Sequence, residues 1–172
     1  MISAWASSNG VLLGQLKTDE KSNEIKAIPH LLKLLDISGC IVTIDAMGTR
    51  KKIAGTIIDN DGDYVLSLKE NQKTLYNDTE LFFDRMGDMK KEGYTFNEYT
   101  TVEGGHGRIE TRKYTITGDI SWLSGREDWA GLKCLGMVER TREISGECSY
   151  EKSYYIASIE CDAEKFGNSV RN

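Results

Sequence analysis

The first part of the chain carries a strand-turn-strand pattern followed by a helical one. Two β-prone runs, 2–7 and 11–17, flank Asn9-Gly10, a pair suited to the positive φ angles of a tight turn, and so predict a hairpin. Apolar residues then recur at helical spacing from 23 to 35. Pro29 falls inside this pattern and is expected either to kink the helix or to mark a late start.

Alternating strand and helix patterns follow. The apolar run 41–44 predicts a short strand of the kind found in a sheet covered on both faces. Residues 53–58 predict a short amphipathic helix that ends at the turn-rich segment 59–63, and 64–68 predict the next strand. A third helix is expected at 75–86, where the apolar side chains share one face. This order predicts an α/β fold in which the two strands are parallel.

The pattern changes after about Gly87, where Thr, Tyr, Gly and charged residues replace the helical periodicity. Four β-like runs predict an antiparallel elaboration with turns at Gly104-Gly105 and Ser145-Gly146. These runs lie near 94–102, 108–116, 132–142 and 150–158. Asp162 is suited to cap a further helix. We therefore expect three parts, namely an α/β core over 1–87, a β insertion over 88–160, and the start of another helix over 161–172.

Composition narrows the class of protein. Hydrophobic residues make up 39% and charged residues 28% of the chain, as in ordinary globular domains. No apolar run approaches the roughly 20 residues that span a bilayer, and the first residues lack the features of a signal peptide, so we expect a cytoplasmic protein with no membrane partner. The net charge of −5 argues against a nucleic-acid-binding surface spread over the whole chain. Any contact with DNA must therefore come from local clusters.

Asp45 is the first candidate for a catalytic residue. It directly follows an apolar strand, and parallel sheets place their chemistry at the carboxyl ends of their strands. The alternative is an aspartate that caps a turn or a helix at the end of a strand. The pattern alone leaves both interpretations open.

Basic and polar residues close to Asp45 could contact DNA. Arg50 and Lys51 belong to a short basic run, enough for one or two phosphate contacts, although such a run is usually only solvated. A second group closes the next strand and opens a helix, where it could contact a phosphate or a DNA end, or else cap the helix. This group consists of Lys69, Asn71 and Gln72.

Another candidate group for DNA binding lies in the β elaboration. Alternate residues of one predicted strand share a face, and here they are His106, Arg108, Glu110 and Arg112. They would form a phosphate-binding row with an internal ion pair. A solvated hairpin face is the alternative interpretation.

Six short motifs occur in the order in which one protein family carries them. They are Ser3-Ala-Trp-Ala6, Lys17-Thr-Asp-Glu-Lys-Ser-Asn-Glu24, Thr43-Ile-Asp-Ala-Met-Gly48, Asp63-Tyr-Val-Leu-Ser-Leu-Lys-Glu-Asn-Gln72, His106-Gly-Arg-Ile-Glu-Thr-Arg112 and Tyr154-Tyr-Ile-Ala-Ser158. The chain closely resembles the H-repeat-associated transposases of bacterial insertion sequences. This resemblance covers essentially the whole chain and implies a DDE-type enzyme with an RNase H-like core. It also implies DNA, as the ends of an insertion sequence, as the partner.

The same resemblance implies a catalytic centre in which two aspartates and a glutamate hold two Mg²⁺ or Mn²⁺ ions. Two such metals activate the attacking oxygen and stabilise the leaving one. Matched residue by residue, Asp45 takes the place of the second aspartate. The family's first aspartate lies in an Asp-Gly-Lys motif that would fall before Met1, and its glutamate in a His-Trp-x-x-Glu-Asn motif that would fall after Asn172. We therefore expect a fragment, truncated at both ends, that binds no metal tightly and is inactive by itself.

Truncation has a structural consequence under this resemblance. The RNase H-like core would be incomplete, because its first strand, which lies between the hairpin and the Asp45 strand, and its final helix would be missing. Two unpaired inner edges favour pairing with another chain, so a homo-oligomer formed by strand pairing is expected. Two further functions stay open. One is a non-enzymatic remnant that binds DNA or full-length transposase, and the other is an RNase H-like nuclease that uses other carboxylates.

Overall fold

The computed structural model describes residues 2–6, 11–17, 21–105 and 107–171, and these ranges contain eight strands, five α-helices and three short 3-10 turns. In chain order they are β1 (Ile2–Ala6), β2 (Val11–Leu16), α1 (Lys21–Leu34), β3 (Ile41–Ile44), η1 (Ala46–Gly48), α2 (Lys51–Asp59), β4 (Asp63–Leu68), η2 (Glu70–Gln72), α3 (Lys73–Asp84), α4 (Met86–Lys91), β5 (Asn97–Gly105), β6 (Arg108–Thr117), η3 (Arg126–Asp128), β7 (Cys134–Ile144), β8 (Glu147–Ala157) and α5 (Ala163–Val170). Of the helices in these ranges, none combines the length and the apolar character that crossing a membrane requires.

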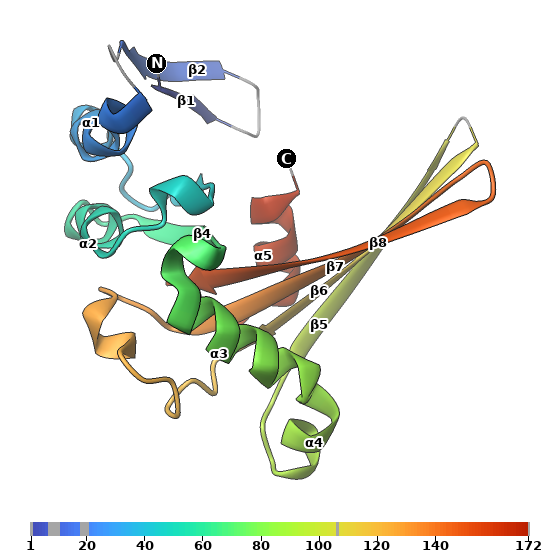
Figure 1. Cartoon of the computed structure of the whole chain (residues 1–172). Coiled ribbons are helices and arrows are strands. Elements are labelled where there is room, and N and C mark those ends of the chain that lie inside the picture. The colour runs from blue at the N-terminus through green and yellow to red at the C-terminus, as the bar shows by residue number, and fades with distance from the viewer. Residues whose placement is uncertain (1, 7–10, 18–20, 106, 172) are drawn as a thin grey trace.

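The strands form two sheets (Figure 1). β1 and β2 pair antiparallel as a two-stranded sheet, which confirms the two strands of the predicted hairpin. The other six strands form one sheet in the order β3-β4-β8-β7-β6-β5. β3 and β4 are parallel, as predicted, and the remaining neighbours are antiparallel. The strands of the β elaboration therefore continue the sheet of β3 and β4 through β8, and the three-part division of the chain stays a prediction.

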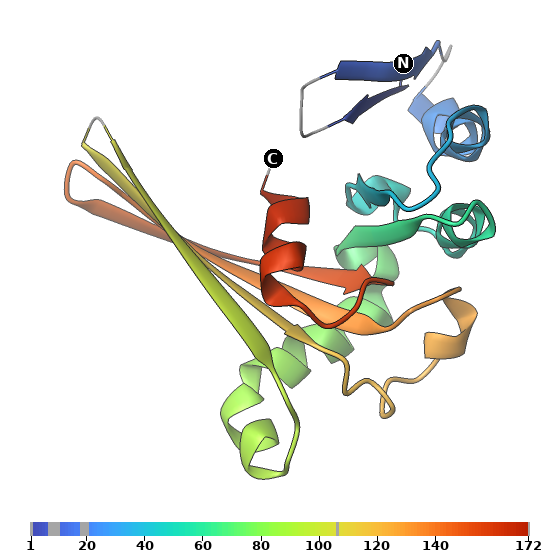
Figure 2. The ribbon, with the colours of Figure 1, turned by 180° about the vertical axis from the view of Figure 1, so that it is seen from behind.

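Helices cover both faces of the six-stranded sheet (Figure 2). On one face, α2 and α3 place Ile57 and Phe83 in a core with Leu66 of β4. On the other face, α5 places Phe166 in a second core with Val65 and Tyr114. Successive residues of a strand point to opposite faces, which is why Val65 and Leu66 belong to different cores. α1 contacts α2 and both strands of the β1–β2 sheet.

Several turns and helix boundaries differ from those predicted. α1 continues through Pro29, so the proline does not mark a late start. Gly104-Gly105 end β5 and do not form the turn, whereas Ser145 and Gly146 have φ angles of 52° and 86° and form the predicted turn between β7 and β8. α4 was not predicted, because its sequence, Met-Gly-Asp-Met-Lys-Lys, is too short to show a period. Asn9-Gly10 lie outside the described residues.

β3 lies at an edge of the six-stranded sheet. Among the described residues it pairs with β4 alone. None of its residues is fully buried, and Thr43 is exposed. The sheet is covered on both faces, as predicted, but β3 itself is less buried than the strands inside the sheet, because α5, the helix on the Thr43 face, lies mainly over β5 and β6.

The strands β5 to β8 extend beyond the helices as a twisted arm (Figure 1). We define the arm as residues 101–105, 107–112 and 140–151. β4 runs antiparallel to β8, with Leu68 opposite Tyr154, so the carboxyl end of β4 is directed toward the arm. β3 is parallel to β4 and ends on the same side. The fold thus brings the residue after β3, the loop after β4 and the base of the arm to one region.

Candidate catalytic and nucleic-acid-binding site

Asp45 stands at the carboxyl end of β3 and is exposed. Its Oδ1 accepts a long hydrogen bond of 3.4 Å from the backbone N–H of Gly48, so the side chain caps the turn η1. Gly48 suits this turn because an added Cβ would overlap the side chain of Ile44. In the described part of the chain, no hydrogen bond or ion pair engages Oδ2 of Asp45. The capping interpretation and a role as a ligand therefore do not exclude each other.

Three polar contacts fasten the turn η1 to the end of β4. The fully buried Thr49 donates its hydroxyl to the carbonyl of Ser67 at 2.6 Å. Asn71 donates its side-chain amide to the carbonyl of Ala46 at 2.6 Å, and Gln72 donates to the carbonyl of Thr49 at 3.1 Å. One N–H of each side-chain amide, that of Asn71 and that of Gln72, is thus used to hold the turn, and contact of these residues with DNA stays a prediction.

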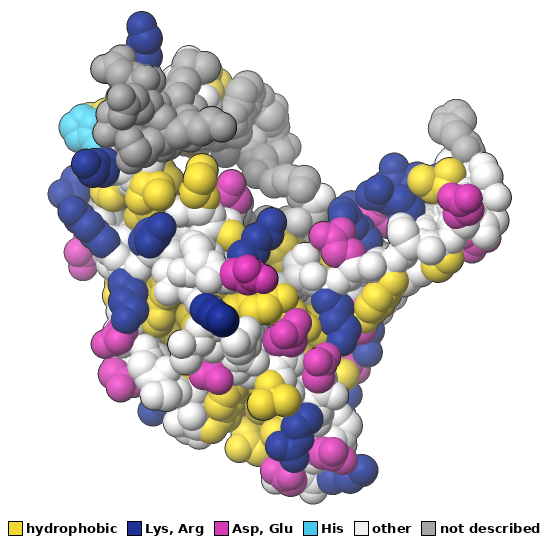
Figure 3. Space-filling view, viewed as in Figure 1, with side chains coloured by type: hydrophobic (Ala, Val, Ile, Leu, Met, Phe, Trp, Pro, Cys, Tyr) yellow, Lys and Arg dark blue, Asp and Glu magenta, His cyan; other side chains and the backbone are white. Residues whose placement is uncertain are grey.

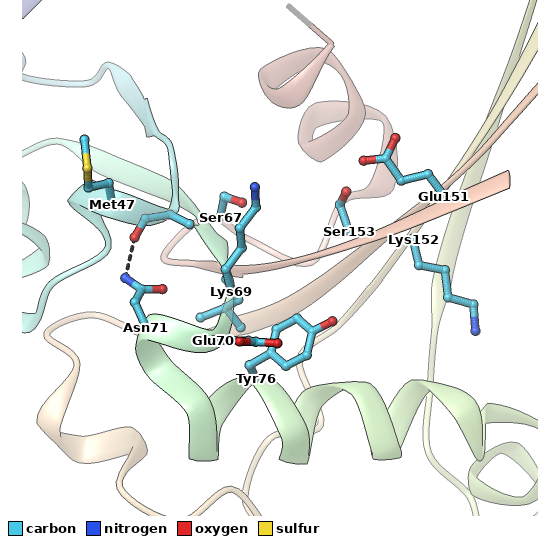
Figure 4. Close-up of a pocket in the computed structure, with 11 residues that line it drawn as sticks. Met47, Ser67, Lys69, Glu70, Asn71, Tyr76, Glu151, Lys152 and Ser153 are labelled. Carbon is cyan, nitrogen blue, oxygen red and sulfur yellow. Dashed lines mark hydrogen bonds between the residues drawn. The ribbon is translucent and has the colours of Figure 1, made fainter. Parts of the chain in front are cut away.

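An open cavity of about 550 Å³ lies between the end of β4 and the base of the arm. Figure 4 shows Lys69 extending upward from the end of β4, while Glu151 and Lys152 leave β8 in opposite directions. The residue after Asp45, Ala46, lines this cavity, but Asp45 itself does not. The exposed ammonium of Lys69 is therefore the basic group that the fold brings nearest to this region from the predicted set.

The two basic residues predicted beside Asp45 lie at the start of α2. Arg50 is exposed, and within the described ranges its guanidinium has no ion-pair partner. Lys51 pairs with Asp128 at 2.6 Å, with both side chains about half exposed. Exposed pairs of this kind contribute little to stability, so Lys51 can exchange its carboxylate for a phosphate at small cost. DNA binding by Arg50 and Lys51 stays a prediction.

The predicted row on β6 is present over the described residues, with His106 outside them. Arg108, Glu110 and Arg112 share one face of the strand, and Glu110 is only 3% exposed. Both arginines pair with its carboxylate, which confirms the internal ion pair. Arg142 of β7, opposite Glu110 in the ladder, adds a third guanidinium, with its Nε 2.9 Å from Oε2.

The three arginines keep Glu110 ionised. Hydrogen bonds from Arg108 above all, then from Arg142, together with the positive charge of Arg112, lower the pKa of Glu110 to about 2, against the opposing effect of burial. The group therefore carries a net charge of +2 at neutral pH. Sequence reasoning missed Arg142, because strand pairing is not visible in a single strand. The available signal was the alternation of Arg140 and Arg142 in the β-like run 132–142.

Comparison with known proteins shows which family this chain belongs to. Residues 1–164 match the family model described as the transposase DDE domain. The chain belongs to this family. It is 39% identical to the putative transposase YncI of Escherichia coli O157:H7 over 99% of this chain and 44% of that protein. It is 38% identical to the H repeat-associated putative transposase YhhI of Escherichia coli K12 over 100% of this chain and 46% of that protein.

A further relative of this transposase domain is the uncharacterized protein in the dhlA 3′ region of Xanthobacter autotrophicus. It is 42% identical over 94% of this chain and 54% of its own length. The chain thus spans about half the length of the curated relatives it matches. No solved structure matches the chain significantly.

Members of the DDE family generally use divalent metal ions. The residues of this transposase domain could hold such ions only if they brought several ligands together. Within the described residues, no group of three or more His, Cys, Asp or Glu side chains is placed to hold a metal ion. Mg²⁺ and Mn²⁺ take several oxygen ligands, and a two-metal centre needs bridging carboxylates. Asp45 alone does not meet that need. The described residues therefore do not fit a metal pair by themselves.

Proposed function

We propose that this chain forms part of the catalytic domain of a DDE transposase, an enzyme that cuts and joins the DNA of an insertion sequence. One observation carries the proposal. In a chain of the transposase DDE domain family, Asp45 is exposed directly after a strand that runs parallel to its neighbour. Parallel sheets present catalytic groups at this end. Asp45 would supply one ligand to Mg²⁺ or Mn²⁺, together with carboxylates that the described residues do not bring to it.

The course of the sheet supports a path for DNA. Thr43 pairs with Val65, so Asp45, which follows two residues later, shares the face of Val65. Through β8 and β7 the same face continues to Arg112 on the arm. DNA lying across this face would meet Asp45, the cavity beside Lys69 and the arginines of the arm in succession.

Titration calorimetry with Mn²⁺ tests the part of the proposal that concerns the metal. The chain and its Asp45→Ala variant are expected to show the same millimolar or undetectable binding, because one carboxylate leaves the ion mostly solvated. Micromolar binding that the substitution abolishes would contradict the single-ligand interpretation. It would favour an RNase H-like nuclease with carboxylates not yet identified.

Fluorescence anisotropy with a labelled DNA duplex tests the part that concerns DNA. We expect binding at low salt that weakens as salt rises, since phosphate contacts release counterions. Asp45→Ala should bind at least equally well, because the substitution removes an exposed carboxylate that repels phosphate. A chain that binds no duplex at low salt would overturn the proposed DNA interface.

A second function is favoured by the edge of β3. Among the described residues this edge has no neighbouring strand, and β1 and β2 form a sheet of their own. A strand from full-length transposase, or from a second copy of this chain, could pair there. We therefore infer, as the alternative, a non-enzymatic chain that binds DNA or full-length transposase.

A further inference from the structure

Arginines of the arm lie on one face of the sheet. Arg112 stands opposite Arg140, and Glu110 opposite Arg142, in the ladder between β6 and β7. Opposite residues of a ladder point to the same side, and so do alternate residues along a strand. Arg108, Arg112, Arg140 and Arg142 therefore share the face that carries α5. In residues 101–105, 107–112 and 140–151, the other face carries no arginine.

Glu110 fixes three of these side chains. Arg108 bonds to its Oε2, Nε of Arg142 lies 2.9 Å from the same oxygen, and Nη2 of Arg112 lies 2.5 Å from Oε1. Arg112 is held at a second point, because its Nη1 donates to the carbonyl of Arg171 at 3.3 Å. Long side chains fixed before a ligand arrives lose less conformational entropy when they bind it. The buried carboxylate thus preorganises the guanidinium groups.

The fixed arginines retain the capacity to bind an anion. Three guanidinium groups offer about fifteen N–H donors, and the contacts with Glu110 use one nitrogen from each. The side chains of Arg108 and Arg142 remain 46% and 33% exposed. Arg140, 36% exposed, pairs only with the exposed Glu151 in the described residues. Figure 3 shows Lys and Arg side chains gathered on the inner side of the arm. The planar guanidinium group of arginine presents donors that suit the oxygens of phosphate.

The arginines of the arm lie far enough from Asp45 that a small anion could not contact both, whereas a polymer could. β3 and β7 are three strand spacings apart, and Glu151, opposite Arg140, lies four residues along β8 from the level of Ser67. With strands about 4.8 Å apart and residues about 3.3 Å apart, Arg140 lies about 20 Å from the end of β3. This corresponds to about six base pairs of a duplex with a rise of about 3.4 Å.

We propose that this face of the arm binds the phosphate backbone of double-stranded DNA, with Arg140 and Arg142 as contacts and Glu110 as the residue that positions Arg142. The contact lies about six base pairs from the point where the same DNA meets Asp45. This inference rests on the proposed function, because it takes DNA to be the partner. It adds a site on β7 and an organising carboxylate.

The test compares two variants of equal charge by anisotropy with one labelled duplex. Arg140→Gln/Arg142→Gln removes two arginines from the proposed face. Lys91→Gln/Lys113→Gln also removes two positive charges, from ion-paired residues, one on α4 and one on the other face of β6. We expect the arginine variant to bind about tenfold more weakly, with a salt slope lower by about two, one for each lost contact. The lysine variant should lose less than about threefold, because salt screens charges beyond about 10 Å.

The outcomes separate this inference from the proposed function. If the wild-type chain binds the duplex and the two variants weaken binding equally, the arm site is wrong and the DNA interface stands elsewhere. If the wild-type chain does not bind at all, both fail. Circular dichroism shows whether each variant is folded. If Arg140→Gln/Arg142→Gln does not fold, NMR of the wild-type chain replaces it, and the inference is overturned if the arginine Nε–H signals of Arg140 and Arg142 do not shift on adding the duplex.

Discussion

Glu110 links stability to pH at the scale of one residue. Its pKa is lowered from the ordinary value of 4.5 to about 2 by Arg108, Arg142 and Arg112, so its stabilising effect is complete above pH 4.5 and is lost as the pH falls from about 4.5 toward 2. Removing one partner of a buried ion pair costs about 3–5 kcal/mol. Since these arginines keep some contact with solvent, we expect Glu110→Gln to lose about 2 kcal/mol at pH 7. Urea unfolding at pH 7 and at pH 3 measures both effects.

The control for Glu110→Gln is the same substitution at another carboxylate of the arm. Glu147 stands exposed at the start of β8, and no ion pair in the described part of the chain involves it. Glu147→Gln should change the free energy of unfolding by less than about 0.5 kcal/mol at either pH. The difference between wild type and Glu110→Gln should shrink at pH 3, because the carboxyl group is then protonated in the unfolded chain, whose pKa is near 4.5, while it is still largely ionised in the folded chain. A difference that stays constant between the two pH values would refute the assigned cause.

Thr49 gives a second prediction at this scale, on the turn after Asp45. Its hydroxyl is buried and donates to the carbonyl of Ser67 at 2.6 Å, so Thr49→Val leaves that carbonyl without its donor. We expect a loss of about 1–2 kcal/mol in thermal or urea unfolding. Thr43→Val, on the exposed side of β3, should be nearly neutral. Equal effects of the two substitutions would show that the Thr49 bond does not fasten the turn.

At the scale of elements, α5 packs on the sheet through a glycine. A Cβ at Gly136 of β7 would lie 2.6 Å from the ring of Phe166, which is fully buried and cannot move aside. Gly136→Ala should therefore destabilise the chain by about 1–3 kcal/mol. Gly55→Ala in α2 has open space around the new methyl group and should stabilise the helix by about 0.5–1 kcal/mol. Melting temperatures should shift in opposite directions, and a shift of the same sign would contradict the packing argument.

Elements of this chain were predictable to the extent that their signals are local. The run 41–44 and its parallel neighbour followed from apolar continuity, and the cap at Asp162 from its position before a helix, where its Oδ1 accepts from Lys165 N–H at 2.9 Å. The edge position of β3 and the pairing of Glu110 with Arg142 depend on which strands become neighbours. No pattern within one strand contains that information. Of the arginines on this face of the arm, Arg108 and Arg112 could therefore be predicted as a group, whereas Arg140 and Arg142 could not be joined to them.

At the scale of the whole molecule, the candidate site also combines a residue that the sequence predicted with contacts that it did not. Asp45 was found because a residue directly after a strand has a defined place in a parallel sheet. That Asn71 and Gln72 hold the turn after Asp45 was not predicted, because those contacts join segments about 25 residues apart. Asn71 and Gln72 could contact DNA only through the side-chain atoms that these hydrogen bonds do not engage. Family resemblance supplied the chemistry, whereas the fold supplies the relation between the turn, the cavity and the arm.

The two edge strands of the six-stranded sheet make different predictions for association. β3 offers an edge made of Ile-Val-Thr-Ile, which is apolar apart from Thr43, whereas β5 carries Glu98 and Glu103 and belongs to the twisted arm. Charges and twist protect an edge, so a second copy should pair along β3. Sedimentation velocity should show association that rises with protein concentration and that Thr43→Lys suppresses. Thr100→Lys, at a position on β5 that is also exposed, should leave association unchanged. A wild-type chain that stays monomeric at high concentration would remove the basis for strand pairing through β3.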